Sequence, residues 1–301
     1  MSKGWLILLL AGCHPAKTED TAAGDAGMGP SPAEVEVRLA ARALELARCP
    51  GSGFVPDVSG VYAALIETAS EVSGHLSGAQ TEILTRYAII QLCQDEDRVV
   101  GEILLCAFDQ SPLVDPAGTC AADLPGDALV ANLPPAVVTG SVDIGNETVF
   151  LSGFDEVWGL QPGADLPAEP SGAGVVESDA LLDQDEDGAP GVTVRGNGLT
   201  PTQAWIARRT TATFSLGIGR GGLAGTTQSE VGQTVLGGPA ARALRGRRYT
   251  ASGAETLWLR ADGLEGSPRL DANGDGLLRC AELGAWVGTA LPAPRAWVCQ
   301  P

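Results

Sequence analysis

Histidine is almost absent from this chain, which has only two in 301 residues, His14 and His75. His75 lies in the turn-like run SGHLSG, which predicts a surface position rather than a metal ligand or a catalytic base. Acyl transfer by a Ser-His-Asp or Cys-His arrangement needs an imidazole beside the nucleophile, and neither G-x-S-x-G nor H-E-x-x-H occurs. The glycine run at residues 217–222 matches G-x-G-x-x-G, but no helix pattern follows it, so we expect a hairpin turn.

Positive charge is also scarce. The chain has 37 acidic and 19 basic side chains and a net charge of −18, which argues against a nucleic acid as partner. The charge is uneven, because residues 31–187 hold 27 acidic and five basic residues, whereas residues 188–254 hold eight arginines and one glutamate. The arginine-rich part offers contacts to an anionic glycan or lipid head group through Arg208, Arg209, Arg245, Arg247 and Arg248. The alternative is that these arginines pair with the acidic region or face solvent.

No apolar run is long enough to span a membrane as a helix. The longest N-terminal one, Trp5 to Leu10, follows Lys3 and ends in Leu-Ala-Gly-Cys, which is the pattern of an export signal. This ending resembles the lipobox of bacterial lipoproteins. The resemblance implies that residues 1–12 are a signal peptide removed in maturation and that Cys13 carries the lipid. It further implies an anchor in the bacterial envelope, and His14 in place of Asp favours the outer membrane.

Residues 13–30 would then comprise the lipidated Cys13 and a flexible tether, because they are small, polar and without periodicity. Six cysteines remain in the exported part. An even number in an exported chain predicts disulfides, and no C-x2-C spacing indicates a metal site. We expect Cys280 to pair with Cys299, and the other four to pair among themselves in an order that the sequence leaves open: Cys49, Cys93, Cys106 and Cys120.

Residues 31–122 are predicted to form a disulfide-braced helical bundle. Ser31, Pro32 and Glu34 make a capping box, and apolar residues then recur at helical spacing as far as Cys49. Three more stripes recur every three or four residues: Val58, Val61, Tyr62, Leu65, Ile66 and Ala69; Ile83, Leu84, Tyr87 and Ile90; and Val99, Ile103, Leu104 and Phe108.

The pattern changes to alternation between residues 127 and 262. In the longest run, Ala204, Ile206, Thr210, Ala212, Phe214 and Leu216 face one side with Arg208 as the exception, which predicts an antiparallel sheet with one wet face. A β sandwich and a barrel both satisfy this pattern. The predicted fold class is therefore α+β: a helical domain at 31–122, an antiparallel β domain at 127–262 and a small calcium unit at 263–301.

The calcium unit is predicted from the stretch LDANGDGLLRCAEL, residues 270–283. It resembles the EF-hand loop, because acidic or amide side chains stand at positions one, three and five, glycine at six and glutamate at twelve. The resemblance implies a Ca²⁺ site made by Asp271, Asn273, Asp275, the Leu277 carbonyl and Glu282. Glycine and proline before residue 271 argue against an entering helix, whereas a helix after the loop is expected. Arg279 at position nine should weaken cation binding.

A second acidic run, DQDEDG at residues 183–188, is similar to the calcium loops of thrombospondin type 3 repeats. Asp183, Asp185 and Asp187 occupy positions one, three and five, but Val194 stands at position twelve, so the closing carboxylate is missing. The resemblance makes these residues a candidate second metal site whose other oxygens come from neighbouring segments. An acidic linker exposed to solvent is the equally acceptable alternative.

The sequence thus predicts a lipid-anchored, exported, calcium-binding protein with a structural or ligand-binding role. Two alternatives stay open. One is an exported calcium-dependent glycan hydrolase, which would need two convergent carboxylates in a cleft on the sheet. The other is a barrel that carries an apolar ligand in a lined internal cavity.

Overall fold

The computed structural model describes residues 29–47, 49, 56–74, 78–114, 120–121, 124–170, 174–196, 202–263 and 269–295. The predictions for the signal peptide, Cys13, residues 14–28 of the tether, His75 and Cys299 fall outside these residues. Over the described part of the chain, no helix is long and apolar enough to cross a membrane.

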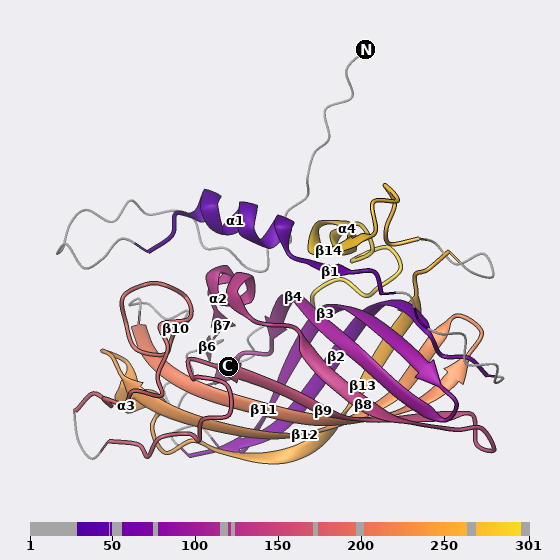
Figure 1. Ribbon diagram of the computed structural model, residues 1–301. Coiled ribbons are helices and arrows are strands. Elements are labelled where there is room, and N and C mark those ends of the chain that lie inside the picture. The colour runs from indigo at the N-terminus through magenta and orange to yellow at the C-terminus, as the bar shows by residue number, and fades with distance from the viewer. Residues whose placement is uncertain are drawn as a thin grey trace.

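The dominant element is one antiparallel sheet that closes on itself (Figure 1). Its strands are hydrogen-bonded side by side in the order β12, β13, β2, β3, β4, β8, β9, β11. The last strand, β11, also pairs with the first, β12, over fifteen residue pairs from Trp205↔Gly237 to Gly219↔Gly222, and this pairing closes the sheet. Closure leaves these eight strands without a free edge, and it decides for a barrel over a sandwich. The strands are β2 (Gly60–Ser73), β3 (Gln80–Asp95), β4 (Arg98–Gln110), β8 (Ala136–Asp143), β9 (Thr148–Trp158), β11 (Thr202–Gly219), β12 (Gly222–Gly237) and β13 (Arg248–Arg260).

Shorter elements extend or cover this sheet. β10 (Val192–Gly196) pairs with the start of β11, and β7 (Leu124–Pro125) pairs with β10. β5 (Leu113–Val114) and β6 (Cys120–Ala121) form one small pair, and β1 (Ala43–Glu45) and β14 (Leu277–Arg279) form another. The helices are α1 (Pro32–Ala41), α2 (Asp127–Asn132), α3 (Ala241–Leu244) and α4 (Cys280–Gly284).

The predicted helical bundle at 31–122 is wrong, and with it the α+β class, because residues 60–110 form β2, β3 and β4 of the large sheet. The reason lies in burial. Ten consecutive residues of β2, Val61 to Ser70, are buried, since its inner face lines the closed sheet and its outer face is covered. A strand buried on both faces has no polar alternation, so its apolar residues match helical spacing by default.

Of the four helices predicted at 31–122, only the first forms in the described residues. The Ser31 hydroxyl accepts a hydrogen bond from the Glu34 backbone N–H, and a Glu34 carboxylate oxygen accepts one from the Ser31 N–H at 2.8 Å, so the capping box is confirmed. The helix ends at Ala41, earlier than predicted, and the next residues pair as β1 with β14. Leu44, expected on a helix face, is instead a buried strand residue at 3% exposure.

Inside the closed sheet, an aromatic and aliphatic half meets a polar half. Tyr62, Phe154, Phe214 and Trp258 pack in the apolar half, with Phe214 edge-on to Trp258 at 5.3 Å between ring centroids. In the polar half, buried Arg86 binds Glu156 through two hydrogen bonds of 2.6 and 2.9 Å, and buried Arg208 pairs with Glu82. The inward set predicted for 202–219 is confirmed, because Ala204, Ile206, Thr210, Ala212, Phe214 and Leu216 are all buried.

The outer face of β2, β3 and β4 is covered by the C-terminal part of the chain. Leu278, Leu283 and Trp286 pack there with Leu44 and Ile89 in a second apolar cluster. A disulfide joins Cys106 of β4 to Cys280 at the start of α4, and another joins Cys49 to Cys93 of β3. The predicted Cys280–Cys299 bridge is therefore wrong, and so is the expectation that Cys106 pairs with one of the other three N-terminal cysteines, whereas Cys49 and Cys93 do pair with each other. Cys280 and its partner Cys106 are 174 residues apart in the sequence, and only the packing of α4 on β4 brings the two cysteines together.

Candidate metal centres

The acidic loop, residues 183–188, is held against the end of β9. The Leu182 N–H donates to the Gly159 carbonyl at 3.0 Å, and the Gly159 N–H donates to the Gln184 side-chain oxygen at 2.8 Å. The Gln184 N–H then donates to the Gly191 carbonyl at 3.2 Å, which closes the loop just before β10. These contacts fix a short chain of four carboxylates at one end of the closed sheet.

Three of these carboxylates converge. Asp183, Asp185 and Asp187 each offer an oxygen, and the three oxygens lie within 4.8 Å of one another. Asp183 accepts the N–H groups of Asp187 and Gly188 at 3.0 and 2.8 Å, which folds the loop around its first residue. The cluster can therefore hold a metal ion. Within the described residues, it is the one group of three or more His, Cys, Asp or Glu side chains so arranged.

Asp185 is the unusual member of the cluster. Its side chain is buried at 6% exposure, and Oδ2 accepts the Thr193 N–H at 2.8 Å, whereas Oδ1 is buried with no hydrogen-bond partner. Burial, reinforced by the charges of Asp187 and Asp183, raises the pKa of Asp185 to about 7 against the opposing Thr193 hydrogen bond. A buried carboxylate without a counter-charge is costly, and a bound cation would remove that cost.

The C-terminal loop, residues 271–282, has the same backbone turn. Buried Asp271 at position one accepts the N–H groups of Gly274, Asp275 and Gly276, at 2.8 to 3.2 Å. Backbone φ is positive at positions four and six in both loops: +57° and +84° at Glu186 and Gly188, and +72° and +81° at Gly274 and Gly276. The acidic loop is thus a second copy of this turn, although a glutamate rather than a glycine takes the left-handed position four.

The C-terminal loop nevertheless does not gather its carboxylates. Arg279 reaches back to Asp275 with 2.7 Å between Nη2 and Oδ2, and this pair lowers the pKa of Asp275. Glu282 accepts the Arg279 backbone N–H at 3.0 Å and so caps α4. The Arg279 side chain, at position nine of the loop, therefore binds the carboxylate of Asp275, which is the expected metal ligand at position five. The helix expected after the loop is present as α4. Before the loop, where the sequence argued against a helix, the described residues form the Asp262↔Arg269 bridge.

The arginines proposed to contact a polyanion are dispersed. Arg208 is inside the closed sheet, where it pairs with Glu82, and Arg209 on the outer face pairs with Asp155 at 2.7 Å. Arg245 donates to the Gly174 carbonyl at 2.9 Å. Arg248 is the first residue of β13 and is exposed, and Arg247 directly precedes it. For Arg208 and Arg209, pairing with acidic residues is what the structure shows.

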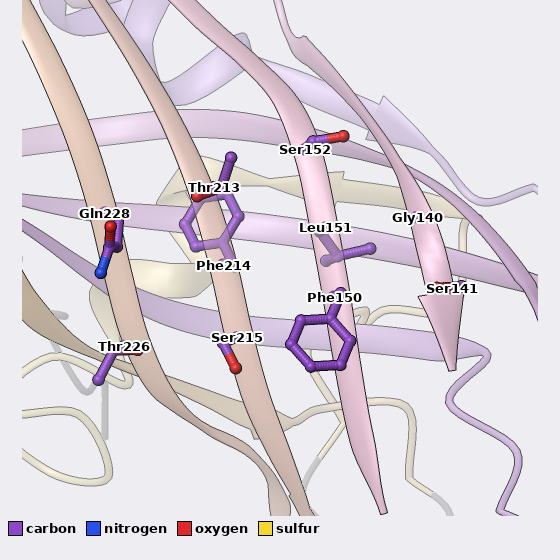
Figure 2. A pocket seen from close by; sticks show the side chains of 10 residues that line it. All are labelled: Gly140, Ser141, Phe150, Leu151, Ser152, Thr213, Phe214, Ser215, Thr226 and Gln228. Carbon is purple, nitrogen blue, oxygen red and sulfur yellow. The ribbon is translucent and has the colours of Figure 1, made fainter. Parts of the chain in front are cut away.

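Two hollows lie on the outer face of the sheet. Figure 2 shows the first, of about 460 Å³, where Phe150 of β9 lies among Ser141, Ser152, Thr213, Ser215, Thr226 and Gln228. Phe150 is 49% exposed, and no charged side chain lines this hollow. The second, of about 640 Å³, lies under residues 292–295 and contains Glu67 and Asp109, which the Arg295 guanidinium and the Arg295 N–H contact at 2.8 and 3.1 Å.

The two loops differ in how their carboxylates are arranged. The C-terminal loop satisfies every position of its pattern, yet the cluster with converging oxygens is the incomplete acidic loop. The sequence held no signal for the burial of Asp185, because the segments that cover it come from β9 and β10. The chain matches no known protein-family model, no curated protein and no solved structure.

Proposed function

We propose that this protein is a calcium-stabilised β-barrel protein of the bacterial envelope, with its principal cation site at Asp183, Asp185 and Asp187. The observation that carries the proposal is Asp185, a buried carboxylate that has one unpartnered oxygen and two further carboxylates beside it. An all-oxygen site suits a hard cation, and Ca²⁺ accepts a flexible shell completed by loop carbonyls and water. The site then needs no glutamate at position twelve, but its affinity for Ca²⁺ should be modest.

The C-terminal loop is proposed as a second, weaker site. Its first ligand is in place, because Asp271 is buried within the turn of residues 271–276. Occupation would require Arg279 to leave Asp275 and Glu282 to leave the α4 cap. Those two contacts are partly exposed and each is worth little, so a cation at millimolar concentration can compete with them.

The proposed compartment agrees with such affinities. Outside the cytosol calcium is not held low, and extracellular modules commonly bind it at ~10⁻⁴–10⁻³ M. Lipidation of Cys13 and location at the outer membrane stay proposals that rest on the sequence. In the mature chain, a folded body would then follow a short tether from the membrane.

Direct titration tests the assignment. Calorimetry on the lipid-free chain should give calcium binding that Asp185→Asn abolishes and Glu282→Gln leaves largely intact. If Glu282→Gln removes the tighter binding and Asp185→Asn does not, the C-terminal loop is the principal site. Absence of binding at about 10 mM calcium would refute both sites.

A second candidate function is ligand binding at the hollow around Phe150. An exposed aromatic ring surrounded by hydroxyl and amide groups, with no charged lining, suits a neutral sugar, whose apolar face stacks on a ring while its hydroxyls form hydrogen bonds. Neutral oligosaccharides such as cellohexaose and chitohexaose are suitable probes. Binding seen by NMR should be lost in Phe150→Ala and kept in Phe108→Leu, a change inside the sheet. Shifts that persist in Phe150→Ala would contradict this site.

The two rival functions receive less support. In the hollow that contains Glu67 and Asp109, Arg295 contacts both carboxylates, so neither is free to act as an acid or nucleophile on a glycosidic bond. The carrier alternative needs an internal cavity, whereas Trp158, Trp258, Phe154 and Phe214 fill the closed sheet in its described part.

A further inference from the structure

A single segment contacts both candidate cation loops. This N-terminal arm, residues 29–47, comprises α1 and β1. Figure 1 shows α1 above α2 and β1 beside β14, along the upper side of the sheet. Its C-terminal half is bound to the C-terminal loop. β1 pairs with β14 in three residue pairs, the Leu46 N–H donates to the Gly276 carbonyl at 2.9 Å, and the Cys280 N–H donates to the Arg42 carbonyl at 3.1 Å. Leu44 and Leu278 are buried together.

The N-terminal half of the arm is bound to the acidic loop. The Arg38 guanidinium lies 2.8 Å from both carboxylate oxygens of Glu186. At Gly29 the two backbones touch, since a Cβ there would lie 2.6 Å from the Glu186 carbonyl oxygen and 3.3 Å from Asp187 Cα. Glu186 takes part in both contacts, and it is the residue at position four of the acidic loop with φ of +57°.

We propose that cation binding at the two loops locks the N-terminal arm onto the sheet and that loss of the cation releases it. The inference rests on the proposed calcium binding and adds a regulatory consequence to it. In both loops, the residues that touch the arm are inside the cation-binding turn: Glu186 in one, and Gly276 and β14 in the other. The conformation that a cation stabilises is therefore the conformation that presents the arm's binding groups.

Without a cation, the acidic loop has reasons to change shape. Three carboxylates within 4.8 Å repel one another, and left-handed φ at a non-glycine residue costs about 1 kcal/mol. Relaxation of Glu186 would move its side chain from Arg38 and its carbonyl from Gly29. Coupling is reciprocal, so a docked arm must in turn raise the affinity of the loops for the cation.

The arm itself is weakly held. The Arg38–Glu186 pair is about half-exposed at 43% and 42%, and such pairs contribute little. Docking also buries Nε and Nη2 of Arg42 without hydrogen-bond partners, and burial lowers the pKa of Arg42 to about 10. Against these stand the buried apolar side chains of Val35 and Leu44 and, at the end of the arm, two hydrogen bonds between the Ala47 backbone and the Gln91 side chain. A modest change at the loops is thus enough to shift the equilibrium.

Release would be limited in extent. The Cys49–Cys93 disulfide joins the chain just after the arm to β3, so the body of the sheet would stay intact while the arm detaches. Nineteen residues extend to at most about 65 Å. If Cys13 carries a lipid, calcium would then control how far the folded body stands from the membrane.

Hydrogen exchange followed by mass spectrometry tests the proposal on the lipid-free full chain, in calcium and in chelator. Amides of residues 42–46 should exchange at least about tenfold faster in chelator, while those of β3 stay unchanged. Trypsin offers an independent readout, because Arg38 and Arg42 are the arm's only cleavage sites and should be cut in chelator alone. Asp187→Asn should expose the N-terminal half of the arm even in calcium, because it removes a proposed ligand and leaves the buried carboxylate of Asp185 in place.

Arg38→Gln is the matched variant, because it removes the positive charge that the arm places beside Glu186 and leaves every proposed metal ligand unchanged. It should speed exchange in the arm and weaken calcium binding severalfold. If titration shows calcium binding but the arm exchanges equally with and without it, the locking proposal is refuted and the cation site stands. If no calcium binds, the proposed function fails first, and the locking proposal fails with it.

Discussion

Replacing Asp185 with asparagine should stabilise the protein in the absence of cation and should remove its response to calcium. Asparagine keeps the shape of the side chain and an oxygen to accept the Thr193 N–H, which Asp185 accepts at 2.8 Å. It removes a buried negative charge beside Asp183 and Asp187. A carboxylate whose role was only to accept hydrogen bonds would give the opposite sign, because its loss would weaken a charge-assisted bond.

The magnitude follows from the pKa. Burial raises the pKa of Asp185 from 3.8 to about 7. Each pKa unit corresponds to ~1.4 kcal/mol, so ionised Asp185 destabilises the cation-free fold by up to about 4 kcal/mol. Local relaxation will lower the measured gain, and about 1 to 3 kcal/mol is expected. Calcium at ten to a hundred times Kd should raise the free energy of unfolding of the wild type by about 1.4 to 2.7 kcal/mol, and leave the variant unchanged.

The stability gained by Asp185→Asn should depend on pH, and the raised pKa of Asp185 fixes the direction. Because the pKa of Asp185 is raised in the folded state, that state binds more protons than the unfolded chain between about pH 3.8 and about pH 7. The stability of the cation-free wild type therefore falls as pH rises through this window. The advantage of Asp185→Asn should be small near pH 4 and complete above about pH 7.

Urea unfolding in chelator, at about pH 4.5 and about pH 8, measures these differences. Asp187→Asn is the control, since the same chemical change in the same loop removes a proposed ligand that is less buried. It should lose calcium binding with a much smaller gain in stability, because burial contributes more to the raised pKa of Asp185 than the charge of Asp187 does. If Asp185→Asn is destabilising in chelator at both pH values, Asp185 is not an uncompensated buried charge, and the reasoning behind the acidic site is refuted.

Three further outcomes are expected. Glu82→Gln should lower the free energy of unfolding by about 3 kcal/mol, because it leaves Arg208 buried at 3% exposure without a counter-charge; a silent change in a denaturation curve would contradict this. A non-reduced peptide map should show Cys106 joined to Cys280, and any other partner for Cys280 would contradict the packing of α4. Cys13→Ser should abolish labelling by a fatty-acid analogue, and labelling that persists would remove the proposed anchor.

Local features of this protein were determined by sequence alone. The capping box at Ser31 and Glu34 forms because its partners lie three residues apart. The inward set of β11 could be predicted because one face of that strand is polar. The shared turn of the two loops also follows from sequence, since short acidic side chains at alternate positions bind their own backbone N–H groups.

Tertiary structure decided the rest. β2 is buried on both faces because its outer side chains pack in one apolar cluster with C-terminal residues such as Leu270 and Trp286, so its residues showed no alternation that would predict a strand. Closure of the sheet depends on β11 and β12 pairing while β13 returns to β2, a contact between residues almost 200 positions apart. Asp185 is the buried member of the acidic cluster, whereas Asp183 is exposed and Asp187 is intermediate. Composition cannot show burial, because the burial of a residue is set by segments that are distant in sequence and adjacent only in the folded chain.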